Sequence, residues 1–219
     1  EAPAATLRLV TVGAAIALVG TAVAVHFLLG VEWLVSFLIG ALLVATGPTV
    51  IAPILEVVPA RDRVEAALET EGIVNDVTAA ILAVVVFEYV VLRDVPLARL
   101  GEEFLLRFGA GIAIGASVAA VAWYVLRHVE LGADNEPRNA RLLVLIAALG
   151  AYGLAEPVLS EAGIAAAAAS GLLLGNTDIP YRDDIEQFGG DVTLLVLAFV
   201  FITLASLLSL DVLLALGLG

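Results

Sequence analysis

Long apolar runs recur along the whole chain, and they decide what it can fold into. A bilayer core of about 30 Å needs about 20 apolar residues as a helix. The runs cover residues 7–29, 31–58, 64–92, 104–126, 140–155 and 158–174, with a last one from about residue 192 onward. With 62% hydrophobic residues in 219, the chain has more apolar surface than a small soluble domain can bury. We therefore predict an all-α, polytopic membrane helical bundle of about seven spans over residues 1–219.

The fifth and sixth runs are shorter than the others, and only Glu156-Pro157 separates them. Proline cannot continue a helix, so it ends one without a long loop. Two short spans and one re-entrant or tilted pair both fit this pattern. The alanine-rich segment 163–171 is typical of a helix that packs closely against its neighbours.

Residue types that many enzymes and cofactor proteins need are missing. The chain has no cysteine and all ten basic residues are arginine, which excludes a thiol nucleophile and a lysine Schiff base. His26 and His128 lie 102 residues apart, without the spacing of a metal or haem site. We expect no enzyme, no cofactor and no nucleic-acid partner. The lipid bilayer is the expected partner, and a homodimer stays open.

The formal net charge is −13, and we assign most of it to loops. The acidic residues placed there are Asp134, Glu136, Asp178, Asp183, Asp184 and Glu186. A salty cytoplasm would tolerate an acidic, lysine-free exterior because salt screens its self-repulsion; GC-rich codon bias is the alternative explanation. The chain contains no methionine and does not begin with a signal-peptide pattern. We therefore expect it to be part of something longer.

The arginines predict an orientation. If seven spans alternate, one side receives Arg8, Arg61, Arg63, Arg127, Arg138, Arg141 and Arg182, and the other receives Arg93, Arg99 and Arg107. Positive charge gathers on the cytoplasmic side of membrane proteins. The turn at Arg61 to Arg63 is therefore predicted to be cytoplasmic, in a multi-pass protein of the plasma membrane.

Residues 31–92 form the most informative part of the sequence. The second apolar run is interrupted by Thr46-Gly47-Pro48, the chain turns near Arg61, and the third run carries Glu71, Asn75 and Asp76. Thr46 and Asp76 each lie fifteen residues from Arg61, or about 22 Å along a helix. In a helical hairpin, a broken helix would thus face a carboxylate at mid-membrane depth. Both features are costly in lipid, and together they indicate an ion or proton path.

The chemistry expected at this depth centres on Asp76. Glu71 and Asn75 are spaced i,i+4 and share a helix face, whereas Asp76 is turned about 100° from Asn75. A proton and a cation would compete for the carboxylate oxygens of Asp76. Thr46 would add its hydroxyl and the carbonyls freed at Gly47-Pro48.

Each of these residues also has a plainer interpretation. Asp76 could be a structural acid, Thr46-Gly47-Pro48 a simple kink, and Asn75 an interhelical hydrogen-bonding group. Glu71 needs a cationic partner, but every arginine is interpreted as a loop or helix-end residue, so its partner would lie outside the chain or be absent. His26, Glu32 and Glu88 lie toward span ends, where snorkelling to water is the default explanation.

The segments Thr46-Gly47-Pro48-Thr49 and Glu71-Gly72-Ile73-Val74-Asn75-Asp76 resemble the cation/proton antiporters of the sodium/proton exchanger family, particularly its prokaryotic members. The resemblance implies that Asp76 carries proton and cation alternately, that Thr46 helps to coordinate the cation, and that Glu71 pairs with an arginine on a later helix. Gly47 stands where family members commonly have aspartate, and Gly72 where serine is frequent. The family fold has about twelve or more helices in inverted repeats, and this chain resembles its central portion.

The resemblance implies a secondary transporter that exchanges a monovalent cation for protons by alternating access. Sodium is the expected cation, with potassium or lithium as alternatives. We expect electroneutral exchange because Asn75 occupies the place where electrogenic relatives carry a second aspartate. A cation channel, an intramembrane aspartyl protease and a membrane fragment that does not transport are the alternatives; the sequence shows no filter loop, and Asp211, the only other aspartate in an apolar run, lies close to the chain end.

Overall fold

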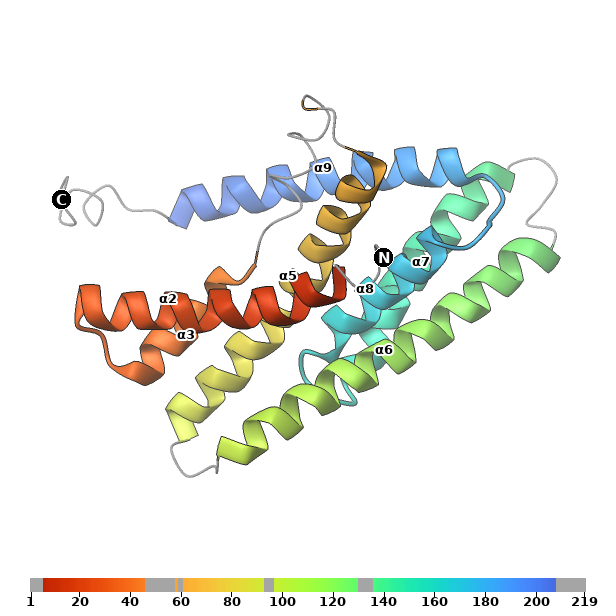
Figure 1. Cartoon of the computed structure of the whole chain (residues 1–219). Coiled ribbons are helices and arrows are strands. Elements are labelled where there is room, and N and C mark those ends of the chain that lie inside the picture. The colour runs from red at the N-terminus through yellow and green to blue at the C-terminus, as the bar shows by residue number, and fades with distance from the viewer. Residues whose placement is uncertain (1–5, 46–57, 59–60, 93–96, 130–135, 208–219) are drawn as a thin grey trace. The chain divides into compact units, whose positions relative to one another are not determined.

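Figure 1 shows the computed structural model of the chain, whose described residues are 6–45, 58, 61–92, 97–129 and 136–207. All regular structure in these residues is helical, as predicted. The elements are η1 (Leu9–Gly13), α2 (Ala14–Leu29), α3 (Trp33–Leu43), α5 (Asp62–Leu92), α6 (Leu97–His128), α7 (Glu136–Ala155), α8 (Ala162–Gly175) and α9 (Arg182–Leu207). The π-helical turn η1 continues directly into α2, so residues 6–29 form one helix.

The helices follow the seven apolar runs. Among the described residues, five helices are long and apolar enough to cross a membrane, and two shorter apolar ones are Trp33–Leu43 and Ala162–Gly175. Three helices do not begin where their apolar run does: α6 begins at Leu97 and the run at 104, α8 at Ala162 and the run at 158, and α9 at Arg182 and the run at about 192. Hydropathy marks where a chain enters lipid, whereas a helix can begin several residues earlier or later.

The turn between α2 and α3 is built from Gly30 and an aromatic stack. Gly30 has φ 66° and ends α2 in the left-handed conformation, which glycine adopts without a steric penalty. The ring of His26 stacks on Trp33 at 3.9 Å between centroids, and its Nδ1 lies 2.7 Å from the carbonyl oxygen of Val31. His26 is thus part of the turn.

Helix α3 packs on both α2 and α5, and α2 and α3 lie side by side in Figure 1. A Cβ on Gly40 would lie 2.7 Å from the carbonyl oxygen of Leu18, so only glycine permits this approach of α3 to α2. The helix ends at Leu43, three residues before the predicted break. Thr46, Gly47 and Pro48 lie outside the described residues.

The chain divides into two compact units. Unit 1 comprises residues 1–121 and 147–177, and unit 2 comprises residues 122–146 and 178–219. In unit 1, one cluster joins Val77, Ile81 and Val85 of α5 to Ala165 of α8. A second cluster, made of alanines, joins α7 to α8 at Ala151, Ala155, Ala162 and Ala166. Large apolar side chains such as Phe27, Leu105 and Leu154 are exposed, as suits helices that contact lipid.

Unit 2 buries Leu126, Ala140, Ile179 and Ile185 as a small core. Arg141 pairs with Asp184 at 2.5 Å. The hydroxyl of Tyr181 donates a hydrogen bond to the carboxylate of Glu136, and this bond, with burial and the carboxylate charge, raises the pKa of Tyr181.

The assignment of the acidic residues to loops was partly wrong. Glu136 lies in the first turn of α7, and Asp183 and Asp184 lie in the first turn of α9. Glu186 also lies within α9. Acidic side chains stabilise the amino end of a helix because the helix dipole is positive there.

Candidate functional site

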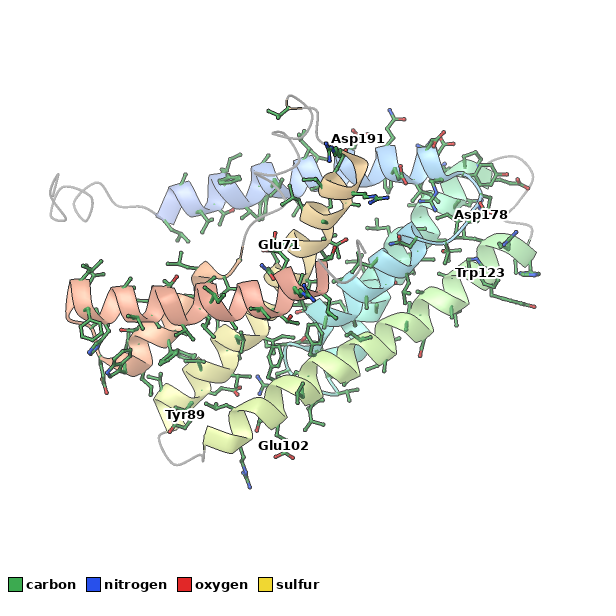
Figure 2. All side chains as sticks on the ribbon, viewed as in Figure 1. Glu71, Tyr89, Glu102, Trp123, Asp178 and Asp191 are labelled. Atoms are coloured by element: carbon green, nitrogen blue, oxygen red, sulfur yellow. The ribbon has the colours of Figure 1, made fainter. Side chains whose placement is uncertain are left out.

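Helix α5 carries the acidic residues predicted for the site and places them near the middle of a span. The apolar span runs from Arg63 to Val90, and Asp76 is thirteen residues from its first residue and fourteen from its last. Figure 2 shows Glu71 part-way along α5, with Tyr89 near the far end. Asp76 therefore lies near the middle of this apolar span, and its depth in the bilayer stays a prediction.

Glu71 and Asn75 lie one helical turn apart and contact each other. The Asn75 Nδ2 donates a hydrogen bond of 2.5 Å to Glu71 Oε1. Both residues are buried, with 7% of Glu71 and 4% of Asn75 exposed. This bond fixes the Asn75 amide, so that its nitrogen faces Glu71 and its oxygen is directed elsewhere.

The oxygen of that amide is an open acceptor. Among the described residues, no hydrogen-bond donor reaches the buried Asn75 Oδ1. A buried polar atom without a partner costs about 1 to 3 kcal/mol, and such atoms call for an explanation in water, an ion or another group. Asn75 thus presents an uncharged oxygen ligand beside Asp76, whose side chain is half-buried.

Neighbouring positions on one face of α5 have different surroundings. Val77, Ile81 and Val85 face the core cluster with α8. Thr70, Val74 and Thr78 face an open, mainly apolar groove of about 1070 Å³ that α2 and α6 also line. The structure thus brings Glu71, Asn75 and Asp76 together on one helix, while the predicted contribution of Thr46, with Gly47 and Pro48, falls outside the described residues.

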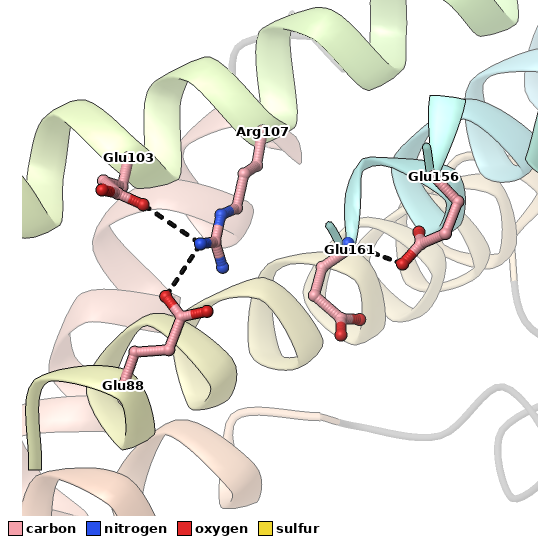
Figure 3. A network of polar contacts seen from close by, with 5 residues as sticks. All are labelled: Glu88, Glu103, Arg107, Glu156 and Glu161. Carbon is pink, nitrogen blue, oxygen red and sulfur yellow. Dashed lines mark hydrogen bonds and ion pairs between the residues drawn. The ribbon is translucent and has the colours of Figure 1, made fainter. Parts of the chain in front are cut away.

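Sequence reasoning missed a second polar cluster, at the end of α5 away from Arg61. Arg107 was interpreted as a loop or helix-end residue, and this was wrong. Glu88 lies toward the end of its span, as predicted, and its side chain is 40% exposed. Arg107 lies inside α6, its side chain is 8% exposed, and its Nη2 is 2.8 Å from Glu88 and 3.0 Å from Glu103. Figure 3 shows these three side chains converging. The signal in the sequence was the spacing of Glu103, Arg107 and Gly111 at four-residue intervals on one helix face.

The family model described as "Sodium/hydrogen exchanger, transmembrane" matches residues 3–218. The chain belongs to the sodium/hydrogen exchanger family. It is a multi-pass membrane protein, and the plasma membrane is its expected location. The resemblance inferred from the Thr46 and Asp76 segments is confirmed by this match.

Individual antiporters are similar to this exchanger chain at about 30% identity. The low-affinity Na⁺/H⁺ antiporter NhaS1 of Synechocystis is 31% identical over 169 residues, which is 76% of this chain and 31% of the relative. The Na⁺/H⁺ antiporter ApNhaP of Aphanothece halophytica is 28% identical over 177 residues, 77% of this chain and 31% of the relative. The K⁺/H⁺ antiporter NhaP2 of Shewanella is 29% identical over 208 residues, 93% of this chain and 35% of the relative. The chain therefore spans about a third of the length of these curated relatives.

Proposed function

We propose that the chain is the central part of a transporter that exchanges a monovalent cation for protons by alternating access, with Asp76 as the shared binding group. The observation that supports this most is the arrangement on α5, where Asp76 follows the buried Asn75 at the centre of a span. The family supports cation/proton exchange in general. Glu71 is proposed to orient Asn75. It is also proposed to keep the same charge throughout the transport cycle, because the ion pair with an arginine that the family resemblance implies would hold it in one form.

Oxygen atoms dominate the proposed site. Carboxylate, amide and hydroxyl oxygens are hard ligands that suit small hard cations. Asp76 supplies the charge, Asn75 Oδ1 is an open oxygen beside it, and Thr46 is proposed to complete the set. We propose sodium as the cation, although similar antiporters are named for sodium and for potassium. Competition among sodium, potassium and lithium in one exchange assay would decide between them.

The direct test replaces the Asp76 carboxylate. Asp76→Asn should abolish cation-dependent proton movement in everted vesicles that contain the protein as its gene encodes it, since the amide cannot carry the proton. Glu69→Gln is the matched control, because Glu69 lies on the same helix but is exposed. Exchange at the wild-type rate in the Asp76 variant would refute the proposed site.

Electroneutral exchange is the finer part of the proposal. One carboxylate beside a neutral amide can trade one proton for one cation, whereas two carboxylates could load two protons. A membrane potential changes the free energy of moving one net charge across the bilayer by about 2.3 kcal/mol per 100 mV. Exchange driven by a fixed proton gradient in proteoliposomes should therefore not change when a potassium-valinomycin potential is imposed. A several-fold response would show that a second group titrates, and Glu71 would be the first to examine.

A further inference from the structure

Arg107 is a buried charge that the exchange chemistry at Asp76 does not use. Its side chain is 8% exposed, whereas those of its partners Glu88 and Glu103 are 40% and 46% exposed. Both carboxylates bond the same nitrogen, Nη2, and Nη1 is buried without a hydrogen-bond partner among the described residues. Removing one partner of a buried charge is costly because the charge that remains is poorly compensated.

The position of Arg107 on α6 places it beside α8. Arg107, Gly111 and Gly115 follow one another at four-residue intervals and so share a helix face. A Cβ on Gly111 would lie 2.5 Å from the Ala165 Cβ and 2.6 Å from the Ala162 carbonyl oxygen. Arg107 therefore lies one turn before Gly111, toward the amino end of α6, at the level where α8 begins. Figure 3 shows the turn before α8 in the same view, with Glu156 and Glu161.

The position of Glu88 on α5 is equally defined. Val77, Ile81 and Val85 form the buried stripe that packs against α8, together with Phe104 and Phe108 of α6. Glu88 is three residues beyond Val85 and continues this stripe by one turn. The Glu88–Arg107 contact thus closes the end of the core cluster, and it joins α5 to α6 at the point where α8 also begins.

We propose that Arg107 is a positioning residue for cation/proton exchange: through Glu88 it fixes the end of α5, and with it the depth and rotation of the Asn75-Asp76 pair. The inference rests on the proposed function. Glu88 is twelve residues from Asp76, or about 18 Å along the axis. Because α5 is a single helix from Asp62 to Leu92, a rotation at its end is carried to Asp76.

Glu88→Gln and Glu103→Gln form a matched pair of variants. The two carboxylates bond the same atom of Arg107 and are similarly exposed, but only Glu88 lies on α5. Exchange is measured in proteoliposomes that contain the protein as its gene encodes it, over a series of sodium concentrations. We expect Glu88→Gln to raise the half-saturating sodium concentration about fivefold and Glu103→Gln to shift it less than about twofold. The charge exchange Glu88→Arg with Arg107→Glu should reverse most of the shift.

Two results would overturn the inference. Equal shifts in both Gln variants would show that negative charge at this end of the helices attracts the cation, without positioning by Arg107. An unchanged half-saturating concentration in Glu88→Gln, with a lowered unfolding temperature, would show a contact that only stabilises the fold.

Failure of the proposed function gives a different result. In that case the wild-type protein moves no protons in response to any monovalent cation. The contact between Glu88 and Arg107 is then tested by comparing the thermal stability lost in Glu88→Gln, in Arg107→Gln and in the double variant. Losses that simply add would refute the contact, because coupled residues show non-additive losses.

Discussion

Helices α6 and α8 approach each other so closely at Gly115 that the position tolerates no side chain, and this predicts a large effect of a small substitution. A Cβ added to Gly115 would lie 2.9 Å from the Cα and from the carbonyl carbon of Ala166, and closer still to its carbonyl oxygen. Ordinary van der Waals contact begins at 3.4 Å. Gly115→Ala therefore requires the two helix backbones to move apart.

The cost follows from what blocks the added methyl group. The blocking atoms belong to the backbone of Ala166, so no rotamer change can relieve the overlap. Overpacking of this kind costs about 1 to 3 kcal/mol. Trimming the neighbour should not help: Gly115→Ala with Ala166→Gly should stay destabilised. At Gly111 the nearest atom is the Cβ of Ala165, so Ala165→Gly should relieve part of the effect of Gly111→Ala.

Gly109→Ala is the matched control. Gly109 lies on the same helix, and apart from the adjoining backbone of α6 no described atom lies within 4 Å of the position of an added Cβ. Alanine is favoured over glycine in a helix by about 1 kcal/mol, so this variant should be neutral or slightly more stable. The assay is thermal unfolding of the detergent-solubilised protein followed by tryptophan fluorescence. If Gly115→Ala unfolds at the same temperature as Gly109→Ala, the close approach of α6 and α8 is refuted.

Three further predictions address other parts of the chain. Ser170→Ala should leave thermal stability unchanged or raise it, since the buried Ser170 Oγ has no hydrogen-bond partner among the described residues; a clear loss in the unfolding assay would contradict this. Because the folded pKa of Tyr181 is raised above its usual 10.0, the stability it contributes is present below pH 10.0 and is lost as pH rises through the folded pKa. Glu136→Gln should lower the pKa of Tyr181, measured from the tyrosinate absorbance lost in a Tyr181→Phe difference titration, and an unchanged titration would refute the contact. A cysteine at Arg61 should be shielded from impermeant thiol reagents outside intact cells and one at Arg99 should react, and the opposite pattern would reverse the predicted orientation.

The helix that carries the candidate site could be predicted because its polar residues are conspicuous. Glu71, Asn75 and Asp76 interrupt a long apolar run, and such interruptions are costly in lipid. Hydropathy therefore gave both the element and the depth of Asp76 within it. The direction of the Asn75 amide could not be predicted, because it depends on the bond to Glu71 Oε1 and not on composition.

Helix boundaries and buried ion pairs were harder to predict. Helix α9 begins at Arg182, ten residues before the apolar run, and Asp183 and Asp184 stabilise its first turn. Arg107 stands close to Glu102 and Glu103, so the segment has the composition of a solvated span end. Its burial depends on a carboxylate of α5, nineteen residues away in the sequence, and hydropathy contains no information about such a partner.

The faces on which membrane helices meet follow from a different pattern than in soluble proteins. Lipid tails are as apolar as leucine, so burying a leucine between helices gains little, and close approach of small residues contributes more. In this chain the buried positions of α8 include Ala162, Ala165 and Ala166, whereas large side chains such as Leu105 on α6 are exposed. The four-residue spacing of Gly111 and Gly115 thus predicts the contact face of α6 better than its hydrophobic residues do. Arg107 lies on that same face, and an arginine aligned with two closely packed glycines is for this reason expected to be buried and paired.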